Sequence, residues 1–115
     1  MLEGILESIK KMLGLDPMYE AFDTDIIIHI NSVFMALNQL GVGPKEGFSI
    51  SGYMENWSDF TDKKNLEAIK TYIYLKVRLL FDPPSNSFTI AAFEEQIKEY
   101  EWRIVTQVER RDLDE

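Results

Sequence analysis

The chain has 115 residues and a mass of 13.4 kDa, the size of a single domain, and its 45% apolar and 28% charged residues are typical of a folded globular protein. Its net charge of −8 argues against a protein that clamps nucleic acid through phosphates, because such contacts need Lys and Arg. The absence of cysteine excludes disulfides, a thiolate zinc site and a cysteine nucleophile. No segment reaches the ~18 apolar residues of a membrane span, and residues 1–14 lack the apolar region of a signal peptide.

Helical periodicity appears in four segments of the chain. Gly14 and Gly41 are suitable stops for the first two helices, and Asp82-Pro83-Pro84 ends the third, because proline cannot donate to the helical ladder. Asp23, Thr24 and Asp25 offer caps to the second helix, and Ser85 or Ser87 offers one to the fourth. The predicted helices are residues 2–13, 24–40, 64–81 and 86–108, and the charged tail 109–115 is expected to fray.

Residues 41–61 lack a long period and are rich in glycine. Within them, residues 48–51 alternate as a short strand does, and Gly52 can make a turn. Loops of this length in a small domain are uncommon and usually functional. The predicted fold is therefore all-α, with one domain over 1–115: a four-helix domain whose long irregular loop, between the second and third helices, has room for a short β-hairpin.

Each predicted helix has an apolar stripe that marks its core face. On the third helix the stripe contains Ile73, and on the fourth it contains Ile97, so both are predicted to be buried within the subunit. Three helices also carry large apolar groups away from these stripes. They are Ile28 and Met35 on the second helix, Tyr72, Leu75 and Leu79 on the third, and Trp102 with Phe88 on the fourth.

These additional apolar groups permit two interpretations. The third helix is apolar nearly all round, so it is either central in the domain or at a subunit interface. Trp102 either packs on the long loop or anchors a partner. Because three helices share the feature, we predict a homo-oligomer in which Ile28, Met35, Tyr72, Leu75, Leu79 and Trp102 contribute to protein interfaces.

Candidate catalytic and metal-binding groups are few. Asp25 and His29 lie one helical turn apart, which suits a metal or an acid–base pair, but no second histidine exists and a half-buried imidazole is the simpler interpretation. Four glutamates of the fourth helix alternate with Lys98 and Arg103, as on a solvated face: Glu94, Glu95, Glu99 and Glu101. With no phosphate-binding loop and no nucleophile elbow, the sequence predicts a protein that is not an enzyme and needs neither cofactor nor metal.

Several stretches of the sequence resemble the head–tail connector family of long-tailed bacteriophages, to which DNA-packaging adaptor and head-completion proteins belong. The longest is residues 66–84, which cover nearly all of the third helix and its Asp-Pro-Pro stop, and residues 96–104 form the second. Further similarity covers residues 9–16, 23–26 and 31–43, so that the resemblance extends over most of the chain, whereas the loop at 44–62 resembles the family least. Members of this kind look like prophage proteins of Gram-positive bacteria.

The resemblance implies a small helical virion protein that forms a ring beneath the portal, extends the DNA channel and provides the tail attachment site. The implied partners are further copies of itself, the portal protein and the next head-completion or tail protein. Genomic DNA would pass through the channel without sequence-specific binding, and no membrane is involved. Its implied location is the virion, at the head–tail interface, and the host cytoplasm during assembly. The residues alone leave two other classes open: a small cytosolic adaptor that binds one protein partner, and a DNA-binding protein.

Overall fold

The computed structural model describes residues 4–61 and 66–114, with side chains up to residue 108. The helices are α1 (Ile5–Met12), α2 (Asp23–Gln39), α3 (Trp57–Phe60), α4 (Leu66–Phe81) and α5 (Ser87–Asp114). No strand forms within the described ranges, where an isolated bridge pairs Gly4 with Asn56. The predicted all-α class is therefore confirmed.

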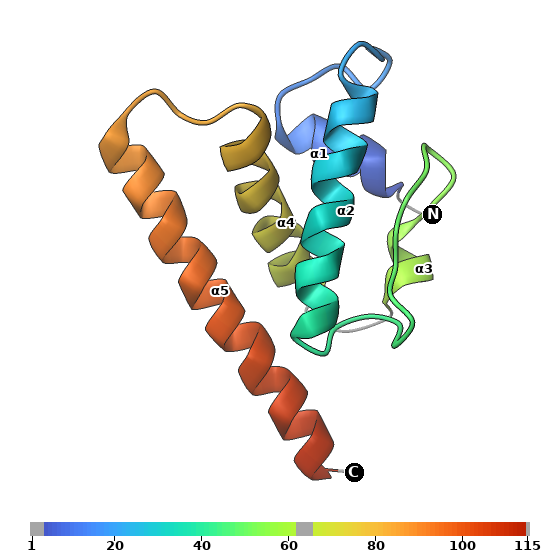
Figure 1. Ribbon diagram of the computed structural model, residues 1–115, viewed down its shortest axis with the longest axis vertical. Coiled ribbons are helices and arrows are strands. Elements are labelled where there is room, and N and C mark those ends of the chain that lie inside the picture. Colours follow the sequence, from blue (N-terminus) through green and yellow to red (C-terminus); the bar gives the residue numbers. More distant parts are fainter. Residues whose placement is uncertain (1–3, 62–65, 115) are drawn as a thin grey trace.

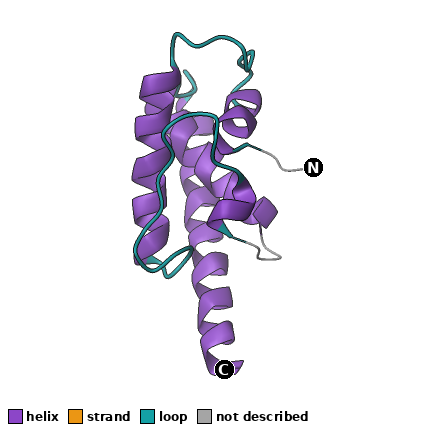
Figure 2. Ribbon diagram, turned by 90° about the vertical axis from the view of Figure 1, so that its right-hand side faces the viewer, coloured by secondary structure: helices purple, strands orange, loops and turns teal. Residues whose placement is uncertain are grey.

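The helix α4 lies at the centre of the arrangement, where it packs against α2, α5 and α1. In Figure 1 α5, α4 and α2 lie side by side, and α1 crosses at the end where α2 begins. The loop after α2 runs along the side of the molecule, and the carboxyl end of α5 extends beyond all other elements (Figure 2). The result is a flattened body of 44 × 36 × 23 Å.

The hydrophobic core lies where α1, α2 and α4 meet, and segments of the loop close it. Ile5, Ile9 and Leu37 are among its fully buried side chains. A cluster of aromatic rings joins the loop to α2: the Phe34 ring centroid lies 5.1 Å from that of Phe48 and 4.7 Å from that of Phe60. Trp57 is buried too, and its indole N–H donates to the Ser8 hydroxyl at 2.9 Å. The loop therefore contributes buried side chains to the core.

The four predicted helices are confirmed in type and position, with differences at their boundaries. The first and third were predicted to begin at residues 2 and 64, which lie outside the described residues. Gly14 and Gly41 follow their helices with φ of +82° and +85°, the left-handed conformation in which glycine ends a helix. The fourth helix was predicted to end at 108, but α5 continues to Asp114. The short helix α3 was not predicted.

Local polar contacts account for three wrong details of the prediction. The strand expected at residues 48–51 does not form, because Ile50 pairs its backbone N–H and carbonyl with the Asn31 side chain, at 2.7 and 3.0 Å. The N-cap of α2 is Phe22, and the Asp23 side chain pairs with Lys10 instead of capping the helix. At the start of α5, Asn86 accepts hydrogen bonds from the N–H groups of Phe88 and Thr89, the role predicted for Ser85 or Ser87.

The predicted core stripes hold best on the inner helices. Ile73 is fully buried as predicted, but Ile97 is only half-buried because α5 contacts the body along one edge. Leu80, in the last turn of α4, is exposed. Burial therefore falls from the centre of the molecule toward α5.

Candidate interaction surfaces

The outer face of α2 carries two large exposed apolar side chains. Ile28 is 58% exposed and Met35 is 67% exposed, two turns apart on the face that points away from the core. Their exposure fits the sequence prediction, and exposed Thr24, Ser32 and Gln39 surround them. We call Ile28 and Met35 with these polar neighbours the α2 face.

Two asparagines of α2 hold the loop instead of belonging to an open face. Asn31 makes the reciprocal pair with Ile50, and the Asn38 side chain donates to the Pro44 carbonyl at 3.0 Å. These contacts imitate the pairing of a strand edge, because a side-chain amide offers the same donor and acceptor as a peptide group. One flank of α2 is therefore occupied, and the α2 face lies beside it.

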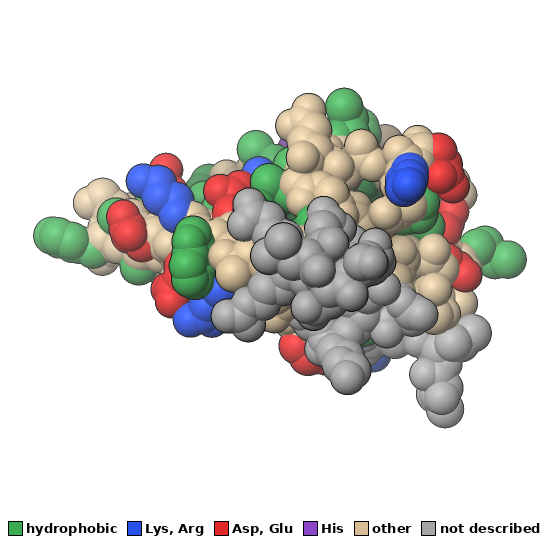
Figure 3. Space-filling view, turned by 90° about the horizontal axis from the view of Figure 1, so that it is seen from below, with side chains coloured by type: hydrophobic (Ala, Val, Ile, Leu, Met, Phe, Trp, Pro, Cys, Tyr) green, Lys and Arg blue, Asp and Glu red, His purple; other side chains and the backbone are tan. Residues whose placement is uncertain are grey.

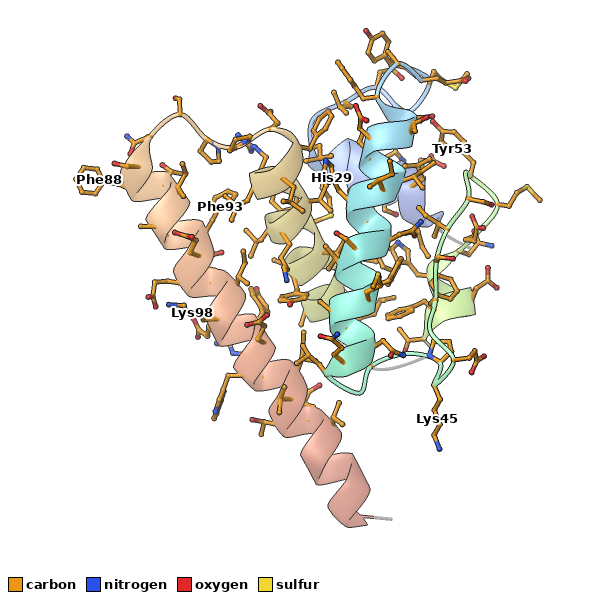
Figure 4. All side chains as sticks on the ribbon, in the orientation of Figure 1. His29, Lys45, Tyr53, Phe88, Phe93 and Lys98 are labelled. Carbon is orange, nitrogen blue, oxygen red and sulfur yellow. The ribbon has the colours of Figure 1, made fainter. Side chains whose placement is uncertain are left out.

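The outer face of α5 is the second exposed apolar surface. Trp102 is 68% exposed, so the long loop does not cover it, and Phe88 is also highly exposed. Phe88 projects away from the body near the start of α5, whereas Phe93 points toward α4 (Figure 4), where its ring lies 6.4 Å from that of Tyr74. Arg103 pairs with Glu99 at 2.7 Å on this exposed side. We call Phe88, Trp102 and this ion pair the α5 face.

Side chains of α4 do not form the third exposed face that the sequence suggested. Tyr72 and Leu75 are buried within the chain, and Leu79 is half-buried. The reason is that α5 covers the far side of α4, so this helix is central, the other interpretation that the sequence left open. Tyr72 and Leu75 are thus wrong as exposed interface residues. Viewed from below, the described surface shows hydrophobic side chains projecting at both margins of the molecule beside charged groups (Figure 3).

The Tyr72 hydroxyl links α4 to α5. It donates to the Glu101 carboxylate at 2.7 Å, and the Lys76 ammonium donates to the same hydroxyl oxygen at 3.3 Å. Burial raises the pKa of the Tyr72 phenol well above its ordinary value, and the hydrogen bond and negative charge of Glu101 raise it further. The outer helix is therefore fixed by a polar contact as well as by its apolar stripe.

A fully buried lysine is the polar feature that the sequence analysis missed. The Lys10 ammonium lies 2.7 Å from the Asp23 carboxylate, donates to the Tyr53 hydroxyl at 2.6 Å, and donates to the backbone carbonyls of Pro17 and Tyr19. The Tyr53 hydroxyl donates in turn to Asp23 at 2.6 Å. We call Lys10, Asp23 and Tyr53 the lysine network. It ties α1, the α1–α2 connection, the start of α2 and the long loop together.

Charge and hydrogen bonding outweigh burial for the two charged groups of the lysine network, Lys10 and Asp23. Burial by itself favours the neutral forms, yet hydrogen bonds with Asp23 and Tyr53 raise the pKa of Lys10 above its ordinary value. The pKa of Asp23 is lowered, since the contacts with Lys10 and Tyr53 overcome its burial. Burial raises the pKa of Tyr53, and its hydrogen bond to Asp23 adds to this. The position of Lys10 beside Ile9 and Leu6 on an apolar helix was the signal available in the sequence.

The candidate catalytic and metal-binding residues, as described, do not come together into one site. His29 is half-buried and Asp25 is exposed, and the described part of the chain contains no cluster of three or more His, Cys, Asp or Glu suited to a metal ion. Glu94, Glu95 and Glu99 lie exposed along α5. Among the described residues, no helix is both long and apolar enough to cross a membrane. What the geometry offers is surfaces for protein contact.

Comparison with known proteins agrees with this description. A family profile described as phage connector protein matches residues 5–111, nearly the whole chain. The chain therefore belongs to the phage connector protein family, a structural class, and its role is that of a phage head–tail connector that contacts other phage structural proteins. No curated protein and no solved structure matches it significantly.

Proposed function

We propose that this protein assembles into a homo-oligomeric ring beneath the portal, extends the DNA channel and provides the tail attachment site. The observation that carries the proposal is the pair of unpartnered apolar surfaces, the α2 face and the α5 face, on one connector-family subunit. A closed ring needs two different surfaces on each subunit, because every contact is head-to-tail. We assign the two faces to the two sides of that contact.

The contribution of each face rests on its exposed anchors. Ile28 and Met35 supply apolar area on one side, and Trp102 and Phe88 supply aromatic area on the other. Buried aromatic residues dominate the energy of many protein interfaces, and removal of apolar area from water contributes about 25 cal/mol per Å². Leu79 is half-buried and contributes at the margin of such a contact.

The acidity of the chain supports the role of a DNA conduit. A net charge of −8 disfavours retention of phosphates, and a wall that repels them lets genomic DNA pass without sequence-specific binding. We place the protein in the virion at the head–tail interface and in the host bacterial cytoplasm during assembly, with neither enzymatic activity nor a cofactor. Its further partners are the portal and the next head-completion or tail protein. A prophage of a Gram-positive bacterium is the proposed source.

Assembly on the portal provides the test. We expect the isolated protein to remain monomeric at low concentration and purified portal to template its assembly, so that the mixture shows ring density beneath the portal in negative-stain images. Met35→Glu should abolish that density, whereas Met54→Glu, at an exposed position on the long loop, should not. A stable complex of one subunit with one cytosolic protein, and no ring with portal, would favour the adaptor alternative instead.

A further inference from the structure

A third exposed apolar cluster lies at the end of the molecule where α1 turns into α2. Its rings form a chain: the Tyr19 and Phe22 centroids are 5.7 Å apart, and those of Phe22 and Phe81 are 5.3 Å apart. Met18, in the same turn, is 84% exposed. We call Met18, Tyr19, Phe22 and the half-buried Phe81 the aromatic corner. It lies at the top of Figure 1, at the opposite end of the molecule from the carboxyl end of α5.

Hydrogen bonds from the lysine network hold the backbone of the aromatic corner. The Lys10 ammonium donates to the carbonyls of Pro17 and Tyr19, the residues that flank Met18, and the Tyr53 hydroxyl also reaches the Pro17 carbonyl at 3.2 Å. The Asp16 carboxylate accepts the N–H of Met18 at 2.9 Å. A fully buried charge is costly unless its hydrogen-bond partners are in place, and here these partners include two carbonyls of the turn. The lysine network therefore fixes one conformation of a turn whose side chains face outward. Preorganisation of this kind lowers the entropy cost of binding.

The charged residues that flank the aromatic corner along the chain are acidic. Asp16 and Glu20 are exposed on either side of Met18 and Tyr19. The adjacent cations are already engaged, because Lys10 is buried against Asp23 and Arg78 pairs with Asp82. An apolar surface with an acidic rim is complementary to an apolar segment flanked by Lys or Arg.

We propose that the aromatic corner is a docking surface for a different structural protein of the virion, which presents an apolar segment flanked by Lys or Arg. The aromatic corner shares no residue with the α2 and α5 faces, so one subunit can hold its neighbours in the ring and a heterologous protein at once. The nature of this partner as a virion protein rests on the proposed function. The lysine network is the positioning element, and the exposed side chains of the corner make the contact.

A photo-crosslinking amino acid at position 18, with matched ones at positions 54 and 35, tests this proposal in assembled particles. We expect position 18 to crosslink to a different virion protein at a segment containing Lys or Arg, and position 54, equally exposed but on the long loop, not to do so. Glu20→Lys should reduce the yield from position 18 about five- to tenfold, and a Lys→Glu or Arg→Glu change in the mapped segment should restore it. Tyr53→Phe should reduce the yield without unfolding the protein.

The outcomes separate this proposal from the proposed function. A position 18 crosslink to a second copy or to DNA, or none at all, overturns the docking surface, whatever position 35 does. A position 35 crosslink to a second copy supports the ring independently. If position 18 captures a virion protein while position 35 captures no second copy, the docking surface stands and the ring contact falls.

Discussion

The helices α2 and α5 both pack against α4, yet they are built differently. Over its 17 residues α2 buries Ile26, Ile30, Val33, Phe34 and Leu37, while α5, with 28 residues, buries only Ile104 completely among its described side chains. The helix α2 is enclosed by the core behind it and the loop beside it, whereas α5 contacts the body along one stripe. Stability therefore concentrates around α1, α2, α4 and the loop, and α5 chiefly supplies surface for contacts.

The lysine network is where the enclosed region should be most sensitive. Lys10→Ala removes a fully buried cation and leaves the largely buried Asp23 carboxylate without its ion-pair partner, and loss of one partner of a buried ion pair costs about 3–5 kcal/mol. Chemical denaturation measured by circular dichroism gives the free energy of unfolding. The matched control is Lys11→Ala, at the next residue, where an exposed pair with Glu7 should contribute less than about 1 kcal/mol. Equal losses in the two variants would mean that burial does not decide the effect.

The contrast between the enclosed core and the outer helix α5 is tested by shortening one isoleucine in each. Ile73→Ala, at a fully buried position of α4, should cost about 2–5 kcal/mol through lost transfer energy and a cavity. Ile97→Ala on α5 should cost less than half as much, because the side chain is already half in water. Thermal and denaturant unfolding of the two variants measures the difference. A larger loss at Ile97 would show that α5 is part of the main core.

The sequence predicted the helices well where periodicity and stop signals agree, as in α2 with its stripe from Ile26 to Leu37 and Gly41 behind it. It failed where a side chain satisfies the backbone of a distant segment. The Asn31 contact with Ile50 takes the place of a strand partner, and no local pattern reveals it. The apolar character of Tyr72 and Leu75 was plain, but whether another helix or another subunit covers them depends on the packing of α5. Lys10 was missed because a charged side chain at the edge of an apolar stripe ordinarily reaches water.

The polar link between the central and outer helices should have a smaller effect, and one that depends on pH. Tyr72→Phe removes the hydrogen bond to Glu101 and should cost about 1–2 kcal/mol near pH 7. Because the pKa of Tyr72 is raised in the folded protein, its contribution is complete below about pH 10, where the unfolded phenol ionises, and is lost as pH rises toward the folded value. Unfolding free energies measured from pH 7 to 11 should therefore fall less steeply in Tyr72→Phe. Parallel profiles would contradict the raised pKa.

The two exposed faces should give the smallest effect on stability and the clearest effect on assembly. Met35→Glu on α2 and Trp102→Glu on α5 change exposed side chains, so each should alter the free energy of unfolding by less than about 0.5 kcal/mol. Each should still block the joining of phage heads to phage tails in vitro. A charge placed at the centre of an apolar contact between subunits is desolvated and unpaired there, so the contact is lost. If the α2 face binds the α5 face, a mixture of the two variants has one intact pair of surfaces between unlike subunits. It should form dimers at high concentration, seen by light scattering, but no rings. Trp102→Glu forming dimers alone would instead indicate that two α2 faces bind each other, and normal joining by both variants would remove these faces from the interface.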